Sequence, residues 1–309
     1  MTSSMASQHV GELPGMFETN VVKQLLSIGI ETSVGAFSLI FSFLHFPGDY
    51  KCFLLRRICK TFSHVLKPPS SLWTSFPHPN YSTLNALMDK LNEVYQNDIK
   101  KAPTLVFIME GNFHSSDSAT VFIRYPMKLI GAGRNKTILS GYGFQIQGSN
   151  SRTKESKGKK VELSRMSVCE SSKHGLYGNR GLFFLCDSMN FTRCGGDGVV
   201  ASCTKGRLIN CVITQCGGNG IYSQSQIMNA IGGQSKIELE GSQTKVQWNG
   251  TNGLSDCYGL KAGRYASLSL LSPLKCYGKG QVSTNNRGRR NYYHSPKGGS
   301  IRVVTSFSN

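Results

Sequence analysis

A repeated glycine-rich phrase constrains the fold of this chain more than any other feature. The phrase is Thr-x-Cys-Gly-Gly-(Asp/Asn)-Gly followed by an apolar residue, and it begins at Thr192 and again at Thr214, 22 residues later. A weaker copy around His174 precedes the first at a spacing of 23 residues. A fixed period of this size is typical of solenoids. The residues between the phrases lack the i, i+3, i+4, i+7 apolar spacing of a helix.

One period has room for three short strands joined by corners. We expect strands at 189–192 and 199–201 around the first phrase, and at 212–214 and 221–223 around the second. The glycines supply the positive φ of a sharp corner, and Asp197 and Asn219 either adopt a left-handed conformation or bond their own backbone. Successive coils would stack about 4.8 Å apart. The sequence therefore predicts a mainly β fold, a right-handed parallel β-helix solenoid with a small N-terminal α-helical segment.

The ten cysteines favour a reduced, buried role. Cys169, Cys194 and Cys216 fall near the same place in successive coils, which predicts a stack of small buried side chains rather than disulfides. No cysteine or histidine spacing fits zinc, so we expect no metal and no cofactor. The most apolar stretch, residues 34–46, is too short to cross a bilayer. With no secretory leader pattern near Met1, we expect a cytoplasmic or nuclear protein without membrane contact.

Composition divides the rest of the chain into segments. Residues 1–33 are weakly patterned and are expected to be poorly ordered. Residues 75–103 are expected to form a linker and an amphipathic capping helix that is N-capped by Ser82 and ends near Asn97. Residues 104–309 would form the β-helix, with a basic insertion at 150–160, a basic tail and a last strand at 301–304. The Gly131–Asn135 segment is interpreted as a corner, because no helix pattern follows it as a phosphate loop requires.

Residues 34–74 differ from the solenoid because they show two helical patterns separated by Pro47-Gly48. The phrase Ile58-Cys59-Lys60-Thr61-Phe62, with Leu72-Trp73 after it, resembles the F-box, although the usual Leu-Pro at the start of that motif is absent. The alternative is a helical cap docked on the solenoid. The apolar residues expected to bind a partner are Phe37, Ile40, Phe41, Leu44, Leu55, Ile58, Phe62 and Trp73.

The solenoid resembles the pectin-lyase-like class, and the two parts together resemble F-box/β-helix substrate receptors. That resemblance implies a non-enzymatic adaptor of a ubiquitin ligase. The F-box-like segment would bind a Skp-family adaptor of a cullin ligase, and the β-helix would bind a protein substrate. Outside that complex the chain is expected to be monomeric.

A carbohydrate-active enzyme is the alternative, since many pectin-lyase-like proteins are enzymes. His174 and Asp197 each precede the glycine at the same corner of successive coils, which places an acid–base pair within reach. Against this, the chain has no Asp-Asp pair and no Gly-His-Gly, and glycoside hydrolysis usually needs two carboxylates. The favoured interpretation is a row of polar side chains that bond the backbone at their own turns, with no catalytic residue.

Polyanion binding is the second alternative. The chain carries 35 basic and 17 acidic residues, a formal charge of +18. Charge of this sign favours weak, salt-sensitive contact with polyanions, but no RNA-binding motif accompanies it, so nucleic acid is disfavoured. The residues expected to make such contacts are Arg152, Lys154, Lys157, Lys159, Lys160, Arg287, Arg289 and Arg290.

Overall fold

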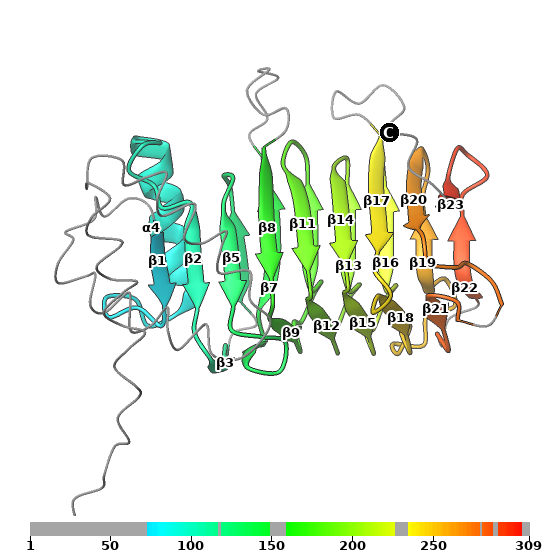
Figure 1. Ribbon diagram of the computed structural model, residues 1–309, viewed down its shortest axis with the longest axis horizontal. Coiled ribbons are helices and arrows are strands. Elements are labelled where there is room, and N and C mark those ends of the chain that lie inside the picture. Colours follow the sequence, from blue (N-terminus) through cyan, green and yellow to red (C-terminus); the bar gives the residue numbers. More distant parts are fainter. Residues whose placement is uncertain are drawn as a thin grey trace, which may run out of the picture. The chain divides into compact units, whose positions relative to one another are not determined.

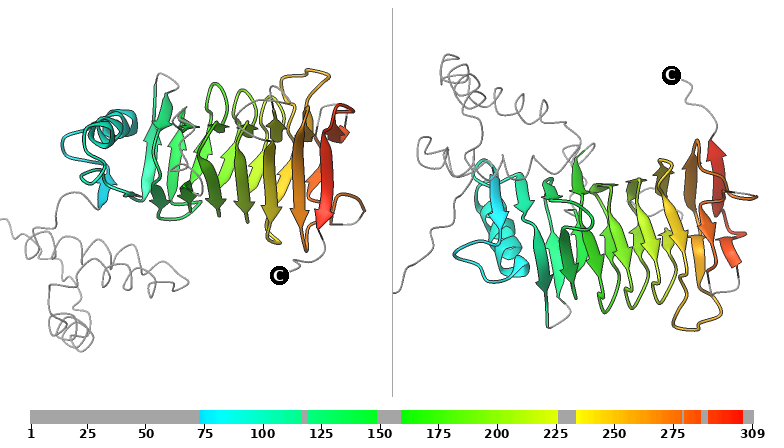
Figure 2. Two further views of the ribbon diagram at one scale, coloured as in Figure 1. Left: turned by 90° about the horizontal axis from the view of Figure 1, so that it is seen from above. Right: turned by 60° about the horizontal axis from the view of Figure 1, so that its bottom comes forward.

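Three parallel sheets follow one another around each turn of the chain, and successive turns stack along one axis (Figures 1 and 2). The computed structural model describes residues 73–116, 119–148, 159–225, 234–278, 280–286 and 290–304. All of these residues belong to the unit Ser63–Asn309. The expected right-handed parallel β-helix is confirmed, because every neighbouring strand pair of the three sheets is parallel and each coil visits the sheets in the same order.

The sheets are named here by the order in which each coil enters them. Within the described residues, sheet 1 contains nine strands: β1 (Trp73–Phe76), β2 (Leu105–Ile108), β5 (Lys128–Gly131), β8 (Lys160–Ser164), β11 (Phe183–Asp187), β14 (Lys205–Ile209), β17 (Ser235–Glu240), β20 (Ala266–Leu271) and β23 (Ser300–Val304).

The other two sheets contain seven described strands each. Sheet 2 consists of β3 (Gly111–His114), β6 (Thr137–Ser140), β9 (Ser167–Cys169), β12 (Asn190–Thr192), β15 (Val212–Thr214), β18 (Lys245–Gln247) and β21 (Ser283–Thr284). Sheet 3 consists of β4 (Thr120–Ile123), β7 (Gly143–Gln147), β10 (Leu176–Asn179), β13 (Val199–Ser202), β16 (Ile221–Gln224), β19 (Tyr258–Ala262) and β22 (Arg290–His294).

The register agrees with the repeat in the sequence. Leu176 pairs with Val199, and Val199 pairs with Ile221, so equivalent residues are 23 and then 22 positions apart. Alternate residues of each strand point inward, as a strand requires. The inward set forms one continuous core along the axis, with Phe184 and Phe191 among its fully buried side chains.

The corner between sheets 2 and 3 differs from the expectation in its backbone. The left-handed residues are Arg193 (φ 52°) and Gln215 (φ 57°), not the glycines that follow them. The glycines are needed because the coils stack closely: a Cβ on Gly195 would lie 2.5 Å from the carbonyl oxygen of Ser172, and one on Gly217 would collide with that of Gly195. The glycines of the repeated phrase thus serve close backbone stacking rather than positive φ.

The buried cysteines form a shorter stack than predicted. Cys194 and Cys216 point inward at equivalent positions, but Cys169 pairs with Thr192 and lies two residues earlier in its coil. Ser171 takes the position equivalent to Cys194. We call the resulting set the inner column: Ser171, Cys194, Cys216, Asn249 and Asn286. The described cysteines are free thiols.

Helix α4 (Leu84–Asn97) lies beside β4 at the end of sheet 3 (Figure 2). Its N-cap is Thr83, whose hydroxyl accepts from the Ala86 amide, one residue later than the predicted Ser82. Its apolar face, including Leu87 and Leu91, is buried in the core. No helix among the described residues is long and apolar enough to cross a membrane.

Candidate functional site

A column of polar side chains runs along the corner that leads from sheet 2 to sheet 3. It consists of His174, Asp197, Asn219 and Tyr258, one from each of four successive coils, and we call it the polar column. The Asp197 amide donates to His174 Nδ1 (3.1 Å), and the Asn219 amide donates to Asp197 Oδ1 (2.5 Å). The Tyr258 amide donates to Asn219 Oδ1 (2.8 Å). The side chains of His174, Asp197 and Asn219 therefore each bond the backbone of the next coil, not that of their own turn as expected.

These bonds define what His174 and Asp197 can do chemically. Because His174 Nδ1 accepts a backbone hydrogen bond, the proton of the neutral imidazole lies on Nε2. Asp197 Oδ1 also accepts from the Asn219 side chain (2.7 Å), and Oδ2 lies 3.5 Å from His174 Nδ1. The Asp197 side chain is only 13% exposed. The corner thus presents an N–H donor from His174, while Asp197 holds the column together.

A second column, on the outer face of sheet 3, is rich in tyrosine. It runs beside the polar column and consists of Tyr177, Val200, Tyr222, Lys261 and Tyr293, which are paired in register; we call it the tyrosine column. The two columns touch, since the rings of His174 and Tyr177 stack at 5.6 Å and those of Tyr258 and Tyr293 at 4.9 Å.

Lys261 is the cation at the centre of this surface. Its Nζ lies 5.2 Å from the ring centre of Tyr222, 5.5 Å from that of Tyr258 and 5.9 Å from that of Tyr293. The lysine side chain is 16% exposed, and Nζ contacts the carboxylate of Asp256 at 3.4 Å. Asp256 itself is 75% exposed. Ring faces attract a cation, so the lysine charge is held in place while its acidic partner stays free to move into solvent.

Tyr222 carries a perturbed hydroxyl. Burial, and then the nearby carboxylates of Asp197 and Asp256, raise the pKa of Tyr222 above its usual value. Cys257, in the adjoining loop, has its pKa raised by burial and by the same two carboxylates. Perturbed groups gather at functional sites more often than elsewhere. At neutral pH the Tyr222 hydroxyl therefore keeps its proton and can donate a hydrogen bond.

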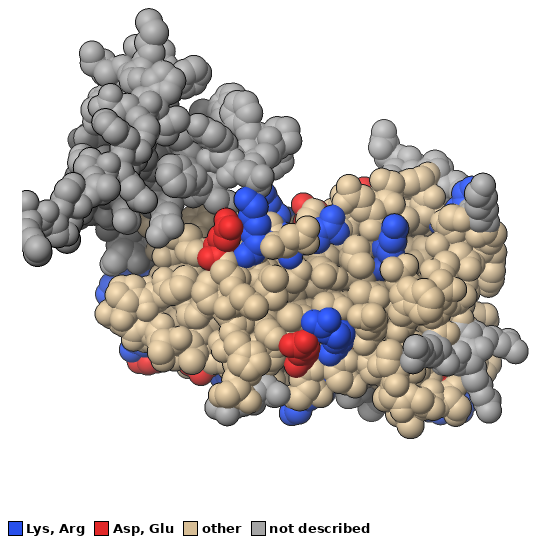
Figure 3. Space-filling model, turned by 90° about the horizontal axis from the view of Figure 1, so that it is seen from below, with Lys and Arg blue, Asp and Glu red and all other residues tan. Residues whose placement is uncertain are grey.

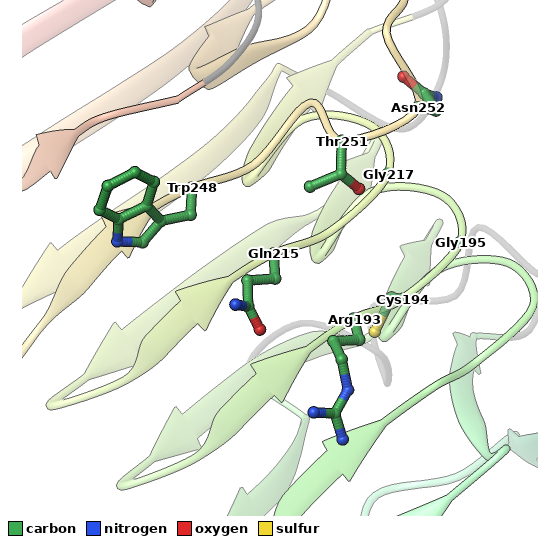
Figure 4. A pocket seen from close by; sticks show the side chains of 8 residues that line it. All are labelled: Arg193, Cys194, Gly195, Gln215, Gly217, Trp248, Thr251 and Asn252. Atoms are coloured by element: carbon green, nitrogen blue, oxygen red, sulfur yellow. The ribbon is translucent and has the colours of Figure 1, made fainter.

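An open groove of about 650 Å³ lies on the other side of the same corner (Figure 4). Arg193, Gln215 and Trp248, the left-handed residues of three successive corners, project into it in one row, which we call the groove row. The remaining lining residues are Cys194, Gly195, Gly217, Thr251 and Asn252.

The charge of the groove is balanced at one end. Arg193 Nη2 lies 2.8 Å from Glu170, whose other carboxylate oxygen accepts from the Ser140 hydroxyl at 2.6 Å. The hydrogen bond from Ser140 and the charge of Arg193 hold the pKa of Glu170 below its usual range.

The surface seen from below is mainly uncharged, with scattered acidic and basic side chains (Figure 3).

Most of the residues predicted to bind a partner or a polyanion lie outside the described residues. These are residues 37, 40, 41, 44, 55, 58, 62, 152, 154, 157, 287 and 289. Trp73 begins strand β1 instead of closing a helical segment, and its ring packs edge-on against Phe107. Lys159 is exposed, Lys160 pairs with Glu162 at 2.6 Å, and Arg290 begins β22. Within the described ranges, no three His, Cys, Asp or Glu residues are grouped to hold a metal ion.

Sequence reasoning brought His174, Asp197 and Asn219 together but missed the tyrosine column and the groove row. The repeat itself contained part of the signal, because Tyr177, Val200 and Tyr222 follow the 23- and 22-residue spacing of the corner glycines. Lys261 and Trp248 could not be found in this way, because the segments before them break the period.

Comparison with known proteins gives structural likeness alone: no family model and no curated relative matches the sequence. Three solved structures are similar. The Agl-KA catalytic domain has 11% identity and a TM-score of 0.34, covering 78% of this chain and 49% of its own. The Azotobacter vinelandii mannuronan C-5 epimerase AlgE4 A-module has 10% identity and a TM-score of 0.24, and the match covers 71% of this chain and 90% of that module. The catalytic domain of a GH87 α-1,3-glucanase in complex with tetrasaccharides has 8% identity and a TM-score of 0.27, and the match covers 77% of this chain and 58% of that domain.

These findings correct the interpretation of the chain as a non-enzymatic F-box adaptor of a ubiquitin ligase. No F-box model matches, and the similar structures are catalytic domains or modules of carbohydrate-processing enzymes. The chain spans about half the length of the first of them, and at 8–11% identity the likeness concerns the fold and assigns no substrate. The class established here is the parallel β-helix.

Proposed function

We propose that residues 73–304 form a carbohydrate-active enzyme domain that binds an acidic polysaccharide along the tyrosine column. The observation that carries this proposal is the cluster of Tyr222, Tyr258 and Tyr293 rings around Lys261 Nζ, on adjacent coils of one outer face. Tyrosine rings offer flat apolar faces to sugar rings and a hydroxyl at the edge. The outer surface of stacked coils is extended, which suits a chain of sugars rather than a single one.

Lys261 supports an acidic substrate over a neutral one. Its Nζ is held between rings, and Asp256, its exposed carboxylate partner, can be replaced by the carboxylate of a uronate unit. A charge-assisted hydrogen bond of this kind is about twice as strong as a neutral one. The tyrosine column would therefore select substrates by charge at Lys261 and by ring stacking at its tyrosines.

The reaction class that fits these side chains is proton transfer beside a carboxylate. Lys261 would pair with the carboxylate and stabilise the negative charge that develops when the adjacent carbon gives its proton to water. The Tyr222 hydroxyl, one coil away, would return a proton to that carbon in epimerisation or to the leaving oxygen in elimination. His174 lies three coils from Lys261, so its Nε2–H would bond a sugar unit further along the chain. Hydrolysis fits less well, because it usually needs two carboxylates, and the single carboxylate of Asp197 is engaged within the polar column. The missing Asp-Asp and Gly-His-Gly motifs agree with a mechanism other than that of polygalacturonases.

The test is turnover of acidic polysaccharides by the full chain. Polygalacturonate and polymannuronate are incubated with the protein, and elimination is followed by absorbance of the unsaturated product and epimerisation by NMR. We expect one of the two to react and a neutral glucan not to. Lys261→Met should lower kcat/KM by on the order of tenfold to a hundredfold, as loss of a bond to a charged group does.

Two further variants separate chemistry from folding. Tyr222→Phe removes only a hydroxyl and should lower kcat more than it raises KM. His174→Gln keeps an acceptor for the Asp197 amide and removes the imidazole, so it should raise KM more than it lowers kcat. Lys236→Met is the matched control, because Lys236 pairs with Glu238 on sheet 1. The proposal is refuted if the unmodified chain neither binds nor turns over any of the acidic polysaccharides tested.

A further inference from the structure

The groove row has the features of a separate binding site that uses none of the residues of the tyrosine column. Arg193, Gln215 and Trp248 have positive φ (52°, 57° and 60°), so each corner turns its side chain outward on the same side (Figure 4). Strand pairing fixes them one coil apart, since Thr192 pairs with Thr214 and Thr214 with Gln247. The sheet thus fixes the backbone positions from which the row projects.

The floor of the groove is backbone. Gly195 and Gly217 line it, and their lack of a side chain is required by the stacked coils beneath them. Their carbonyl and amide groups take part in hydrogen bonds between coils: the Gly217 amide donates to the Cys194 carbonyl, and its carbonyl accepts from Asn252. A ligand can therefore approach closely, and its contacts come from the side chains along the rim.

Those side chains have unused binding capacity. Trp248 is 45% exposed, which is rare for so large an apolar ring. The Gln215 backbone amide donates to the Gln247 carbonyl, but no described residue bonds the Gln215 side-chain amide, which offers two N–H donors and a carbonyl acceptor. Arg193 contacts Glu170 through Nη2, and a guanidinium carries five N–H donors in all. The Trp248 indole can stack on one apolar face of a ligand. The Gln215 side-chain amide and the remaining Arg193 N–H groups can bond several of its hydroxyls.

The charge balance decides between ligand classes. Glu170 already neutralises Arg193 at 2.8 Å, and no other charged residue lines the groove as the described residues define it. An anionic ligand would have to compete with Glu170 for the guanidinium. An uncharged ligand with many hydroxyls leaves the ion pair intact and uses the remaining donors.

We propose that this groove binds an uncharged oligosaccharide, with one sugar ring stacked on Trp248 and hydroxyls bonded to Gln215 and Arg193. This site goes beyond the function proposed above and does not depend on it, because the two surfaces favour ligands of different charge. It would hold a neutral stretch of glycan beside the face that takes an acidic one.

The experiment uses tryptophan fluorescence of the full chain. The sequence contains two tryptophans, Trp73 and Trp248, so the variant Trp73→Phe leaves Trp248 as the sole reporter. The probes are cellotetraose, mannotetraose and maltotetraose, with tetragalacturonate as the acidic counterpart. We expect at least one neutral probe to protect Trp248 from acrylamide quenching and to give saturable binding by calorimetry.

Substitutions then assign the contacts. Trp248→Ala should weaken binding of that probe by about tenfold or more, as loss of a central aromatic anchor does. Trp248→Phe should restore part of it, and Gln215→Ala should weaken it by about fivefold. Tyr277→Ala is the matched control, because Tyr277 is 76% exposed and does not line the groove; its binding should be unchanged, as should that of Lys261→Met.

Two results would overturn the proposal. One is the absence of binding by all three neutral probes with Trp248 still fully quenched by acrylamide. The other is tighter binding of tetragalacturonate that is lost in Arg193→Met, which would make this an anion site. Circular dichroism of each variant establishes that the β-helix is folded, so loss of binding in Trp248→Ala is attributable to the ring.

Discussion

Asp197 shows how a single side chain can link neighbouring coils in this fold. Its amide, Oδ1 and Oδ2 contact the coils before and after it, through His174 on one side and Asn219 on the other. A carboxylate with its oxygens engaged in this way positions its neighbours rather than attacking a substrate. His174, by contrast, uses only Nδ1 in these bonds, so its Nε2–H can donate to a ligand.

A prediction at the residue scale concerns the buried thiol of Cys211, whose pKa is raised by burial to about 12 from an ordinary value of 9.0. The unfolded chain releases this proton near pH 9 and the folded chain keeps it. The contribution to the free energy of unfolding is therefore full below pH 9 and falls by about 1.4 kcal/mol per pH unit as pH rises toward 12.

Cys211→Ala tests this in urea denaturation with a reductant present. The variant should be less stable than the unmodified chain at pH 8, because it leaves a small cavity. The difference between the two proteins should shrink by about 1 kcal/mol between pH 9 and 10. A difference that stays constant over that interval contradicts the assignment.

At the scale of elements, the inner column changes from thiols to amides along the solenoid. Asn249 is fully buried; its Oδ1 accepts from the Cys216 amide at 3.0 Å, and its Nδ2 donates to the Ile213 carbonyl at 3.3 Å and to Asn286 Oδ1 at 3.0 Å. The two amides thus bind strands β15, β18 and β21 together. They replace the close packing that the thiols of Cys194 and Cys216 provide in the preceding coils.

Asn249→Ala should destabilise the protein by about 1–3 kcal/mol, because it leaves the Cys216 amide buried without an acceptor. The free energy of unfolding by urea measures this. Hydrogen exchange should show the largest loss of protection in β18 and β21. Asn112→Ala, at an exposed position of β3, should change the free energy of unfolding by less than about 0.5 kcal/mol. Equal effects of the two substitutions would contradict the role given to Asn249.

At the scale of the whole solenoid, the open edge of sheet 3 is closed by α4. The Asn85 side chain donates to the Thr120 carbonyl (2.8 Å), and the Asn92 side chain donates to the Phe122 carbonyl (2.9 Å) and accepts from the Arg124 amide (3.2 Å). The helix thus takes the place that another strand would occupy beside β4. An unpaired edge invites association with other chains, which such a cap prevents.

The double variant Asn85→Ala/Asn92→Ala should lower the free energy of unfolding by about 2–3 kcal/mol and increase association at high concentration. Unfolding in urea and sedimentation velocity measure the two effects. Lys90→Ala is the control on the same helix, because the ion-pair partner of Lys90 among the described residues is the exposed Glu93, and such pairs contribute little. A monomeric double variant of unchanged stability would show that apolar packing alone holds the helix.

The sequence by itself determined the coil, its corner and the inward position of Cys194 and Cys216. It could do so because the Thr-x-Cys-Gly-Gly phrase repeats at the period of the backbone, so one alignment of residues gives the register of two strands at once. The same logic placed His174, Asp197 and Asn219 in one column. It failed at Cys169, because a lone cysteine near a corner does not fix the register by itself.

Only the tertiary structure decided what surrounds that corner. Tyr258 joins the polar column, Lys261 joins the tyrosine column and Trp248 joins the groove row, although insertions before them destroy the period that would have indicated it. Their neighbours are set by hydrogen bonds between strands far apart in the sequence, which depend on where each insertion ends. A local pattern such as that of residues 34–74 carries no such information, which is why resemblance there led to an adaptor function that the comparisons overturned.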